Sequence, residues 1–380
     1  MVNKLDDIAT RGVVPGIQLA VADAFLDTQQ LICLQEGRIK GMIYGRRGNP
    51  AQLPLENKIA ELEHAESALV FCSGMAAVST TLPALVKNRQ NVLITDEGNV
   101  TIRSYFTTVL PKFGVEVTTV PIDDIKNIRK YIKDNTVLFF SELPTNPFLR
   151  VIDLHPLISV AKEKGITTIV DSTFASPLNI NPLVYGADLV LHSATKYLGG
   201  HHDLFAGAVA GSEAIISQIR GYRNTLGTNL DPLGAFLLNR SLYTFELTMN
   251  ARNKKALEVA RYLEKQSKVD KVWYPGCRSH PDYKVAKKQM TGFGGTITFT
   301  LKADENETGR FVDSLAKPYL AHNFGGCTST IEQHVLFTHF DKRREAEKRG
   351  INGNLLRYSV GLESSSQDII GDFENAFKSF

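Results

Sequence analysis

One lysine lies between an apolar run and a Gly-Gly pair in the stretch LHSATKYLGGHHD, residues 191–203. Ser193 and Thr195 stand just ahead of this lysine, Lys196. A lysine amine can form a Schiff base with an aldehyde, and hydroxyls beside free helix N–H groups can bind a phosphate. The segment therefore indicates a ligand with both an aldehyde and a phosphate, and pyridoxal 5'-phosphate (PLP) has both.

Two other segments would complete a PLP site. CSGMAAV, residues 72–78, predicts a helix whose first free amides, at Gly74 and Met75, face an anion. Asp171 follows the apolar run TTIV and would keep the pyridine nitrogen protonated, which makes PLP an electron sink. Each feature also has an ordinary structural interpretation, such as a solvated lysine, a helix cap or a turn. Their joint order along the chain favours the PLP site.

The elements that position these residues alternate between strand-like and helix-like runs. Apolar residues at helical spacing occupy 55–71, strands are predicted over 91–97, 115–121, 136–144, 167–177 and 187–196, and helices over 124–134 and 153–165. This alternation predicts a mainly parallel sheet covered by helices, with ligands bound at the carboxyl ends of the strands. Those ends carry Asp96, Glu142, Asn146, Asp171, Ser193 and Lys196.

The chain is predicted to have three parts. Residues 1–55 are turn-rich and indicate an arm, 56–245 form a large PLP-binding domain, and 246–380 form a smaller α+β domain. In the last part, a helix over 253–268 precedes strand-like residues 294–301 and 354–364, and a further helix follows.

Composition limits the class of partner and the compartment. The formal net charge is +3, from 43 basic and 40 acidic residues, and no basic run is interleaved with aromatics, so neither nucleic acid nor an anionic membrane is an expected partner. No apolar run reaches the roughly 18 residues that cross a bilayer, and the start has no secretory signal, so we expect a cytoplasmic protein. The four cysteines lack CxxC spacing, and the adjacent His201 and His202 are poorly placed for one ion, so we expect no metal site.

From about Tyr44 to the C-terminus, the sequence resembles the PLP enzymes of cysteine and methionine metabolism. That family includes cystathionine γ-synthase, cystathionine γ-lyase, methionine γ-lyase and the O-acylhomoserine sulfhydrylases. The resemblance implies an α/β fold of the type I aminotransferase-like class, with a large mainly parallel-sheet PLP domain and a smaller α+β C-terminal domain. The matching segments are YGRRGNP, FCSGMAA, TTVLPKFGVEV, ELPTNPFLRVID, VDSTFASP, HSATKYLGGHHD, GFGGTITF and RYSVGLE.

The resemblance also implies roles for individual residues. Lys196 matches the Schiff-base lysine, which also moves protons, Asp171 the partner of the pyridine nitrogen, and Asn146 the residue near the phenolic oxygen. Arg357 matches the arginine that binds the substrate α-carboxylate, and a guanidinium can clamp a carboxylate with two hydrogen bonds. The phosphate cup is matched by Gly74, Met75, Ser193 and Thr195.

Tyr44 and Arg46 match a pair that reaches the phosphate of a neighbouring chain. The resemblance therefore implies active sites shared between subunits of a homodimer, or of a homotetramer built from two such dimers.

The sequence departs from the family pattern in three places, two on the substrate side and a milder one at Gly45, which replaces the serine of the usual Tyr-Ser-Arg. Asn99 stands where the family usually has a tyrosine that stacks on the cofactor ring. Asn323 replaces a serine, and Thr328 replaces a glutamate with which some members recognise the distal amino group of cystathionine. The expected substrate contacts are Arg357, Asn323, Thr328 and Asn99.

The resemblance implies a PLP-dependent elimination or replacement at the γ-carbon of a sulfur-containing or O-activated homoserine-type amino acid. One alternative is an enzyme of a specialised pathway that acts on a non-sulfur or β-substituted amino acid. Another is a PLP-binding regulatory or structural protein without turnover, against which the combination of Lys196, Asp171 and Arg357 argues. Lyase and replacement activity both remain open at this point, as do the dimer and the tetramer.

Overall fold

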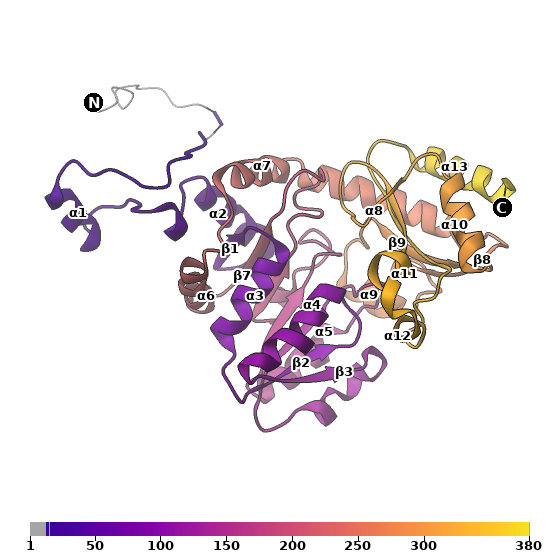
Figure 1. Ribbon diagram of the computed structural model, residues 1–380, viewed down its shortest axis with the longest axis horizontal. Coiled ribbons are helices and arrows are strands. Elements are labelled where there is room, and N and C mark those ends of the chain that lie inside the picture. The colour runs from indigo at the N-terminus through magenta and orange to yellow at the C-terminus, as the bar shows by residue number, and fades with distance from the viewer. Residues whose placement is uncertain (1–12, 15, 380) are drawn as a thin grey trace.

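A seven-stranded sheet forms the centre of the larger half of the protein (Figure 1). The computed structural model describes residues 13–14 and 16–379. The strand order is β1-β7-β6-β5-β4-β2-β3, in which β7 is antiparallel to both neighbours and the remaining pairs are parallel. The predicted α/β class with a large mainly parallel sheet is confirmed. The strands are β1 (Ser67–Phe71), β2 (Asn91–Thr95), β3 (Glu116–Val120), β4 (Thr136–Glu142), β5 (Thr167–Asp171), β6 (Leu189–His192) and β7 (Gly207–Gly211).

Helices cover both faces of this sheet, which explains why its strands are apolar on both sides. Alternate residues of a strand face opposite sides. Leu69 and Phe71 of β1 accordingly pack with α3 (Gly74–Leu85) and α6 (Glu213–Leu226), whereas Val70 packs with α2 (Gln52–Glu63) and α7 (Pro232–Leu242). α5 (Leu154–Glu163) covers the neighbouring strands β4 and β5.

A second sheet of five strands lies in the C-terminal half, drawn in orange in Figure 1. Its order is β10-β11-β12-β9-β8, and α8 (Phe245–Leu263), α10 (Glu305–Ser314) and α13 (Ser366–Ser379) pack against it. The predicted strands at 294–301 and 354–364 and the helix at 253–268 are present in this part. The strands are β8 (Val269–Trp273), β9 (Thr296–Leu301), β10 (Tyr319–Leu320), β11 (Thr330–Gln333) and β12 (Leu355–Ser359).

Short helices connect the larger elements. The α-helices among them are α4 (Val100–Ser104), α9 (Tyr283–Gln289), α11 (His334–Thr338) and α12 (Arg343–Glu347). The 3-10 and π turns are η2 (Gly45–Arg47), η3 (Tyr105–Val109), η4 (Leu110–Phe113), η5 (Ile122–Tyr131), η6 (Pro182–Tyr185) and η7 (Phe340–Lys342).

The described part of the N-terminal segment extends away from the rest of the chain and carries the short helix α1 (Thr28–Gln35) (Figure 1). Several of its apolar side chains are exposed, among them Leu19, Val21 and Leu26. The division into 1–55, 56–245 and 246–380 stays a prediction. In the described part of the chain, no helix has the length and apolar character that spanning a membrane requires.

Two predicted helices differ from the structure. In 55–71, α2 ends at Glu63, His64 adopts a left-handed conformation, and the remainder forms β1. In 124–134, the chain forms η5, a 3-10 element interrupted at Asn127.

Strand β7 was not predicted, because its sequence GAVAG consists of residues with low β-propensity and only one valine. Its small residues serve close packing: a Cβ on Gly207 would lie 2.2 Å from the Ser73 carbonyl oxygen. Glycine at this position therefore lets the start of α3 approach the sheet, and this start is one wall of the site described next.

Candidate active site

The carboxyl ends of β4, β5 and β6 and the N-terminus of α3 surround one cavity. Glu142 and Asp171 close their strands as directly paired residues. The cavity brings together six of the predicted site residues, which are Gly74, Met75, Asn99, Asp171, Ser193 and Lys196. The other lining residues are Ile102, Glu142, Thr173, Phe174, Leu191 and Phe324.

The amine of Lys196 lies in a polar but mostly buried position. Its Nζ donates a hydrogen bond to Asn323 Oδ1 and lies 5.1 Å from the centroid of the Phe324 ring. Burial and the nearby positive charge of Arg357 lower the pKa of Lys196 to about 8, although the negative charge of Glu332 partly opposes them. The neutral amine, the form that attacks an aldehyde, is therefore more abundant near neutral pH than for an exposed lysine, at about a tenth of the total at pH 7.

The start of α3 is held close to the end of β6. Ser73 caps the helix, since its Oγ accepts from the Ala76 amide at 3.0 Å. A Cβ on Gly74 would lie only 2.8 Å from Ser193 Cβ, so glycine is what allows this approach. The first helical amides and the Ser193 hydroxyl thus lie at the same end of the cavity, a suitable place for an anion.

Thr195 is placed differently from Ser193. Its Oγ1 accepts from the Ala206 amide at 2.9 Å and donates to the Ala206 carbonyl at 3.2 Å. It is not among the residues that line the cavity, so a phosphate role for Thr195 stays a prediction.

Asp171 is supported by a residue that the sequence analysis did not single out. The amide of Thr173 donates to Asp171 Oδ1 at 3.0 Å, and the Thr173 hydroxyl donates to the same oxygen. That hydroxyl also accepts from the Ser193 amide at 2.8 Å, so Thr173 links the two walls of the cavity. A hydroxyl two residues after a strand-end aspartate is the only signal that the sequence offered.

Glu142, noted at a strand end without a role, also faces this cavity. Its Oε1 accepts from the Asn99 amide at 2.5 Å, whereas its buried Oε2 has no hydrogen-bond partner. Burial and the neighbouring Asp171 raise the pKa of Glu142 to about 8, and burial also raises the pKa of Asp171. A cation bound between them would favour the ionised carboxylate.

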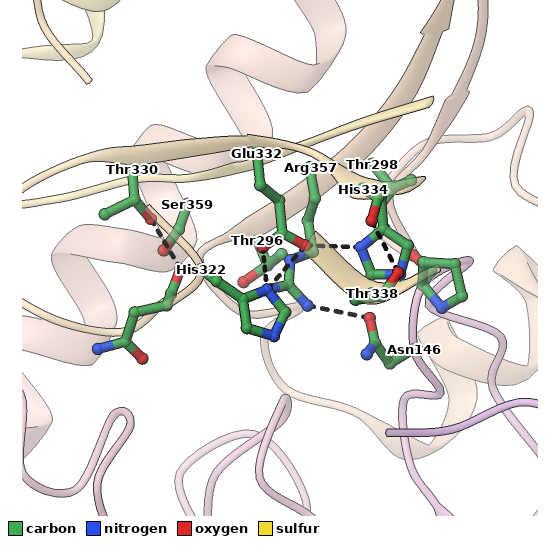
Figure 2. A network of polar contacts seen from close by, with 12 residues as sticks. Asn146, Thr296, Thr298, His322, Thr330, Glu332, His334, Thr338, Arg357 and Ser359 are labelled. Atoms are coloured by element: carbon green, nitrogen blue, oxygen red, sulfur yellow. Dashed lines mark hydrogen bonds and ion pairs between the residues drawn. The ribbon is translucent and has the colours of Figure 1, made fainter. Parts of the chain in front are cut away.

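Arg357 belongs to a polar network on β11 and β12 (Figure 2). Its Nη1 donates to Asn146 Oδ1 at 3.0 Å, and its Nη2 lies 3.0 Å from Glu332 Oε1. Glu332 also accepts from His334 Nδ1 at 2.6 Å and from His322 Nδ1 at 2.5 Å. Despite its burial, the guanidinium and the two imidazoles hold the pKa of Glu332 well below its ordinary value. Glu332, His322 and His334 were not predicted, because their link to Arg357 is recognisable only once β11 and β12 pair.

The Arg357 guanidinium also reaches the edge of the cavity. It lies 5.8 Å from the Phe174 ring centroid and 5.5 Å from that of Phe324. These two rings stack on each other with centroids 4.2 Å apart. Phe324 thus lies close to both cationic groups, because Lys196 approaches the same ring.

Asn99 lines the cavity but turns its side-chain oxygen towards its own helix. Asn99 Oδ1 accepts from the amides of Thr101 at 2.9 Å and Ile102 at 3.3 Å and thereby caps α4. The next tyrosine along the chain, Tyr105, directs its hydroxyl to the Ser79 carbonyl and does not line the cavity.

The remaining predicted contacts lie outside the cavity. Thr328 is not among the lining residues, and its carbonyl oxygen faces His202 Nε2 at 3.3 Å. Tyr44 and Arg46 line a separate cavity between the arm and α7, where Arg46 donates to the Asn224 carbonyl. Within one chain, this pair therefore does not join the other predicted cofactor residues.

The chemistry of these groups fits PLP. A lysine amine with a lowered pKa suits the aldehyde, and the glycine-lined helix start suits the phosphate. The buried carboxyls, one with an unpartnered oxygen, suit a protonated ring nitrogen. Among the described residues, no group of three or more His, Cys, Asp or Glu side chains is placed to hold a metal ion, and the four cysteines are free thiols.

Comparisons with known proteins give a consistent result. The model of the family described as Cys/Met metabolism PLP-dependent enzyme matches residues 2–378. Cystathionine gamma-synthase 1 of Arabidopsis thaliana, a chloroplastic protein, is 40% identical over 373 residues, which are 98% of this chain and 66% of the plant protein. This chain therefore spans just under two thirds of that relative's length.

A bacterial relative and a solved structure cover more of their own length. L-methionine gamma-lyase of Fusobacterium nucleatum subsp. nucleatum is 39% identical over 342 residues, 89% of this chain and 86% of the lyase. The crystal structure of metB from Corynebacterium glutamicum superimposes with a TM-score of 0.90 at 31% identity, covering 97% of this chain and 93% of that one.

Proposed function

The chain belongs to the family of Cys/Met metabolism PLP-dependent enzymes, and from this premise we propose that it eliminates or replaces a γ-substituent of an amino acid. The substrate class is a sulfur-containing or O-activated homoserine-type amino acid. The observation that carries this proposal is the convergence of Lys196, Asp171 and the start of α3 on one cavity, with Arg357 at its edge.

The residues of the chain would hold the cofactor at three points. Lys196 would bind its aldehyde, the amides of Gly74 and Met75 with the Ser193 hydroxyl would bind its phosphate, and Asp171 would pair with its ring nitrogen. Bound in this way, PLP supplies an electron sink for carbanions next to the substrate amine. Thr173 holds Asp171 through two hydrogen bonds to Oδ1, which would fix the orientation of the carboxylate that is to pair with the cofactor.

Arg357 would bind the substrate carboxylate. Asn146 and Glu332 fix its guanidinium from two sides, which lowers the conformational cost of binding. Lys196, once released from the aldehyde, would move a proton to or from the substrate, because its lowered pKa gives it both forms near neutral pH.

We further propose a homodimer, or a homotetramer of two dimers, with active sites shared between chains, and a cytoplasmic location. Tyr44 and Arg46 support the shared site, because they lie in a separate cavity of their own chain. The exposed apolar side chains of the arm, such as Leu19 and Val21, would be covered by a second copy.

Two measurements test the proposed function. Borohydride reduction of the PLP-loaded protein followed by peptide mapping should find the cofactor on the peptide that contains Lys196. A panel of amino acids should then identify substrates by release of 2-oxo acid, ammonia or thiol. Cofactor on another lysine, or binding without any turnover across the panel, would overturn the proposal.

One observation favours a second candidate, an enzyme that acts on a non-sulfur or β-substituted amino acid. The side-chain oxygen of Asn99 is engaged by α4, and Tyr105 points elsewhere, so none of the tyrosines in the described part of the chain lines the cavity. In the same panel, turnover of β-substituted or sulfur-free amino acids without turnover of sulfur substrates would identify this candidate.

A further inference from the structure

His202 is the second of the two histidines that follow the glycine pair of the lysine segment, and the proposed function gives it no role. Its Nε2 faces the Thr328 carbonyl oxygen at 3.3 Å, and its Nδ1 faces Asn323 Nδ2 at 2.8 Å. A carbonyl only accepts, so Nε2 carries the ring proton and Nδ1 of the neutral imidazole accepts. The amide nitrogen of Asn323 therefore points at His202, and its oxygen is left for Lys196.

These contacts form one chain of donors that starts at the lysine. Lys196 donates to Asn323 Oδ1, Asn323 donates to His202, and His202 donates to the Thr328 carbonyl. The side-chain amide of asparagine has an NH2 group that donates and an oxygen that accepts. A partner that accepts from the NH2 group therefore leaves the oxygen facing the opposite side. An oxygen turned towards Lys196 favours the ammonium form over the neutral amine.

The backbone around His202 is built to hold the ring there. His202 has φ +63°, a left-handed conformation that is uncommon for any residue except glycine. Across from it, a Cβ on Gly326 would lie 2.0 Å from the His202 ring, so the glycine makes room for the imidazole. The adjacent His201 differs, because it is exposed and directs Nδ1 to the Gly199 carbonyl at 2.7 Å.

We propose that His202 is a positioning residue that orients the Asn323 amide and thereby stabilises the protonated amine of Lys196. This role rests on the proposed function, because it matters only if Lys196 binds the cofactor aldehyde.

Other charged and titratable groups face the same chain of contacts and stay unchanged in its test. Arg357 and Glu332 act on Lys196 with opposite signs. Near His202, the Arg252 guanidinium donates to the carbonyls of Gly200 and Gly326, and the Cys327 thiol donates to the Gly200 carbonyl.

The test measures how fast the full chain, freed of PLP, captures added PLP at a series of pH values. Only the neutral amine attacks an aldehyde, so the midpoint of the rate profile reports the ionisation of Lys196. Capture is followed as visible absorbance and needs no substrate. His202→Leu removes the acceptor for Asn323, and we expect its midpoint to fall by about half a pH unit or more, since a hydrogen bond to a charged group is worth about one unit.

Two variants serve as rescue and control. His202→Asn keeps an acceptor at the place of Nδ1 and tolerates a positive φ, so its midpoint should equal that of the unmodified chain. His201→Leu changes the neighbouring histidine outside the chain of donors and should also leave the midpoint unchanged. If His202→Leu does not fold, as judged by circular dichroism, His202→Gly also lacks the acceptor and is free of the φ restriction.

A double variant shows whether His202 acts through Asn323. Asn323→Ala alone should lower the midpoint by about one pH unit. Adding His202→Leu should then lower it no further, whereas additive shifts would overturn the proposed route. An unchanged midpoint in folded His202→Leu or His202→Gly would overturn the role of His202. Failure of the unmodified chain to capture PLP at all would instead overturn the proposed function.

Discussion

Leucine in place of Arg357 should weaken substrate binding and leave the cofactor bound. The guanidinium is held by Asn146 and Glu332 at 3.0 Å each and lies at the edge of the cavity, but it does not line it. A charge-assisted hydrogen bond to a carboxylate contributes about 1.5–3 kcal/mol, which corresponds to a roughly 10- to 150-fold change in affinity for each bond lost. We therefore expect KM to rise at least about tenfold while the visible absorbance of bound PLP persists.

The same substitution should also destabilise the fold, for a separate reason. Glu332 is almost fully buried, and without Arg357 it keeps only His322 and His334 as partners. Removing one partner of a buried ion pair typically costs about 3–5 kcal/mol. Glu332→Gln combined with Arg357→Leu leaves no unpaired carboxylate, so the double variant should recover part of the stability.

The two effects can therefore be separated by measuring KM and the melting temperature of the three proteins together. KM should stay high in the double variant although its melting temperature rises, and Arg357→Lys, which keeps the charge without the fork, should give an intermediate KM. The reasoning is refuted if KM returns to normal in the double variant, or if Arg357→Leu loses PLP while KM is unchanged.

Three other outcomes follow from the site. Arg46→Ala and Lys196→Ala, each inactive alone, should regain activity when co-expressed, because a mixed dimer contains one intact shared site, and hybrids that form yet remain inactive would contradict this. Asn99→Tyr should raise turnover of methionine, cystathionine or O-acetylhomoserine, or tighten PLP binding, since a stacked ring adds on the order of 1 kcal/mol, and a variant with neither higher turnover nor tighter PLP binding would contradict it. Burial raises the pKa of Glu142 from 4.5 to about 8, so the folded chain keeps a proton that the unfolded chain releases, and stability falls as pH rises between these values. The free energy of unfolding in urea should be measured for PLP-free Glu142→Gln and for the unmodified chain at pH 5 and pH 8. The difference should favour the variant more at pH 8 than at pH 5, and an equal difference at both pH values would refute this.

The large sheet was predictable because its parallel strands carry the signal that their burial requires. Strands β2, β4, β5 and β6 contain buried apolar runs that end in polar residues, and helices on both faces impose that pattern. β7 was not predicted, because its position requires small residues instead of large apolar ones. Gly207 must be small to admit the start of α3, and a run of glycine and alanine carries no strand signal.

The same distinction explains which site residues were found. Asp171, Ser193 and Lys196 each follow a strand in sequence, so the rule that ligands bind at strand ends was enough to group them. Glu332 and His202 act through contacts with residues more than twenty positions away, at Arg357 and Asn323 respectively. Such pairs depend on the register of β11 with β12 and on the loop that carries Asn323, neither of which has a local sequence pattern.

The residues proposed to hold the cofactor and those proposed to contact the substrate differ in how freely they can be substituted. The proposed cofactor residues lie at strand ends and at the start of a helix, and the sheet fixes their spacing. This spacing leaves little room, because a Cβ on Gly74 would lie only 2.8 Å from Ser193 Cβ. On the proposed substrate side, Phe324 lines the cavity and the neighbouring Asn323 accepts from Lys196, and both belong to a segment outside the large sheet. A side chain on that segment can be exchanged without moving Asp171 or the phosphate end of the cavity. A new residue there must still give Lys196 a hydrogen-bond partner, because a mostly buried amine without one is costly. The Asn323 and His202 contacts are consistent with this requirement, because the Asn323 oxygen accepts from Lys196 while its nitrogen faces the His202 ring.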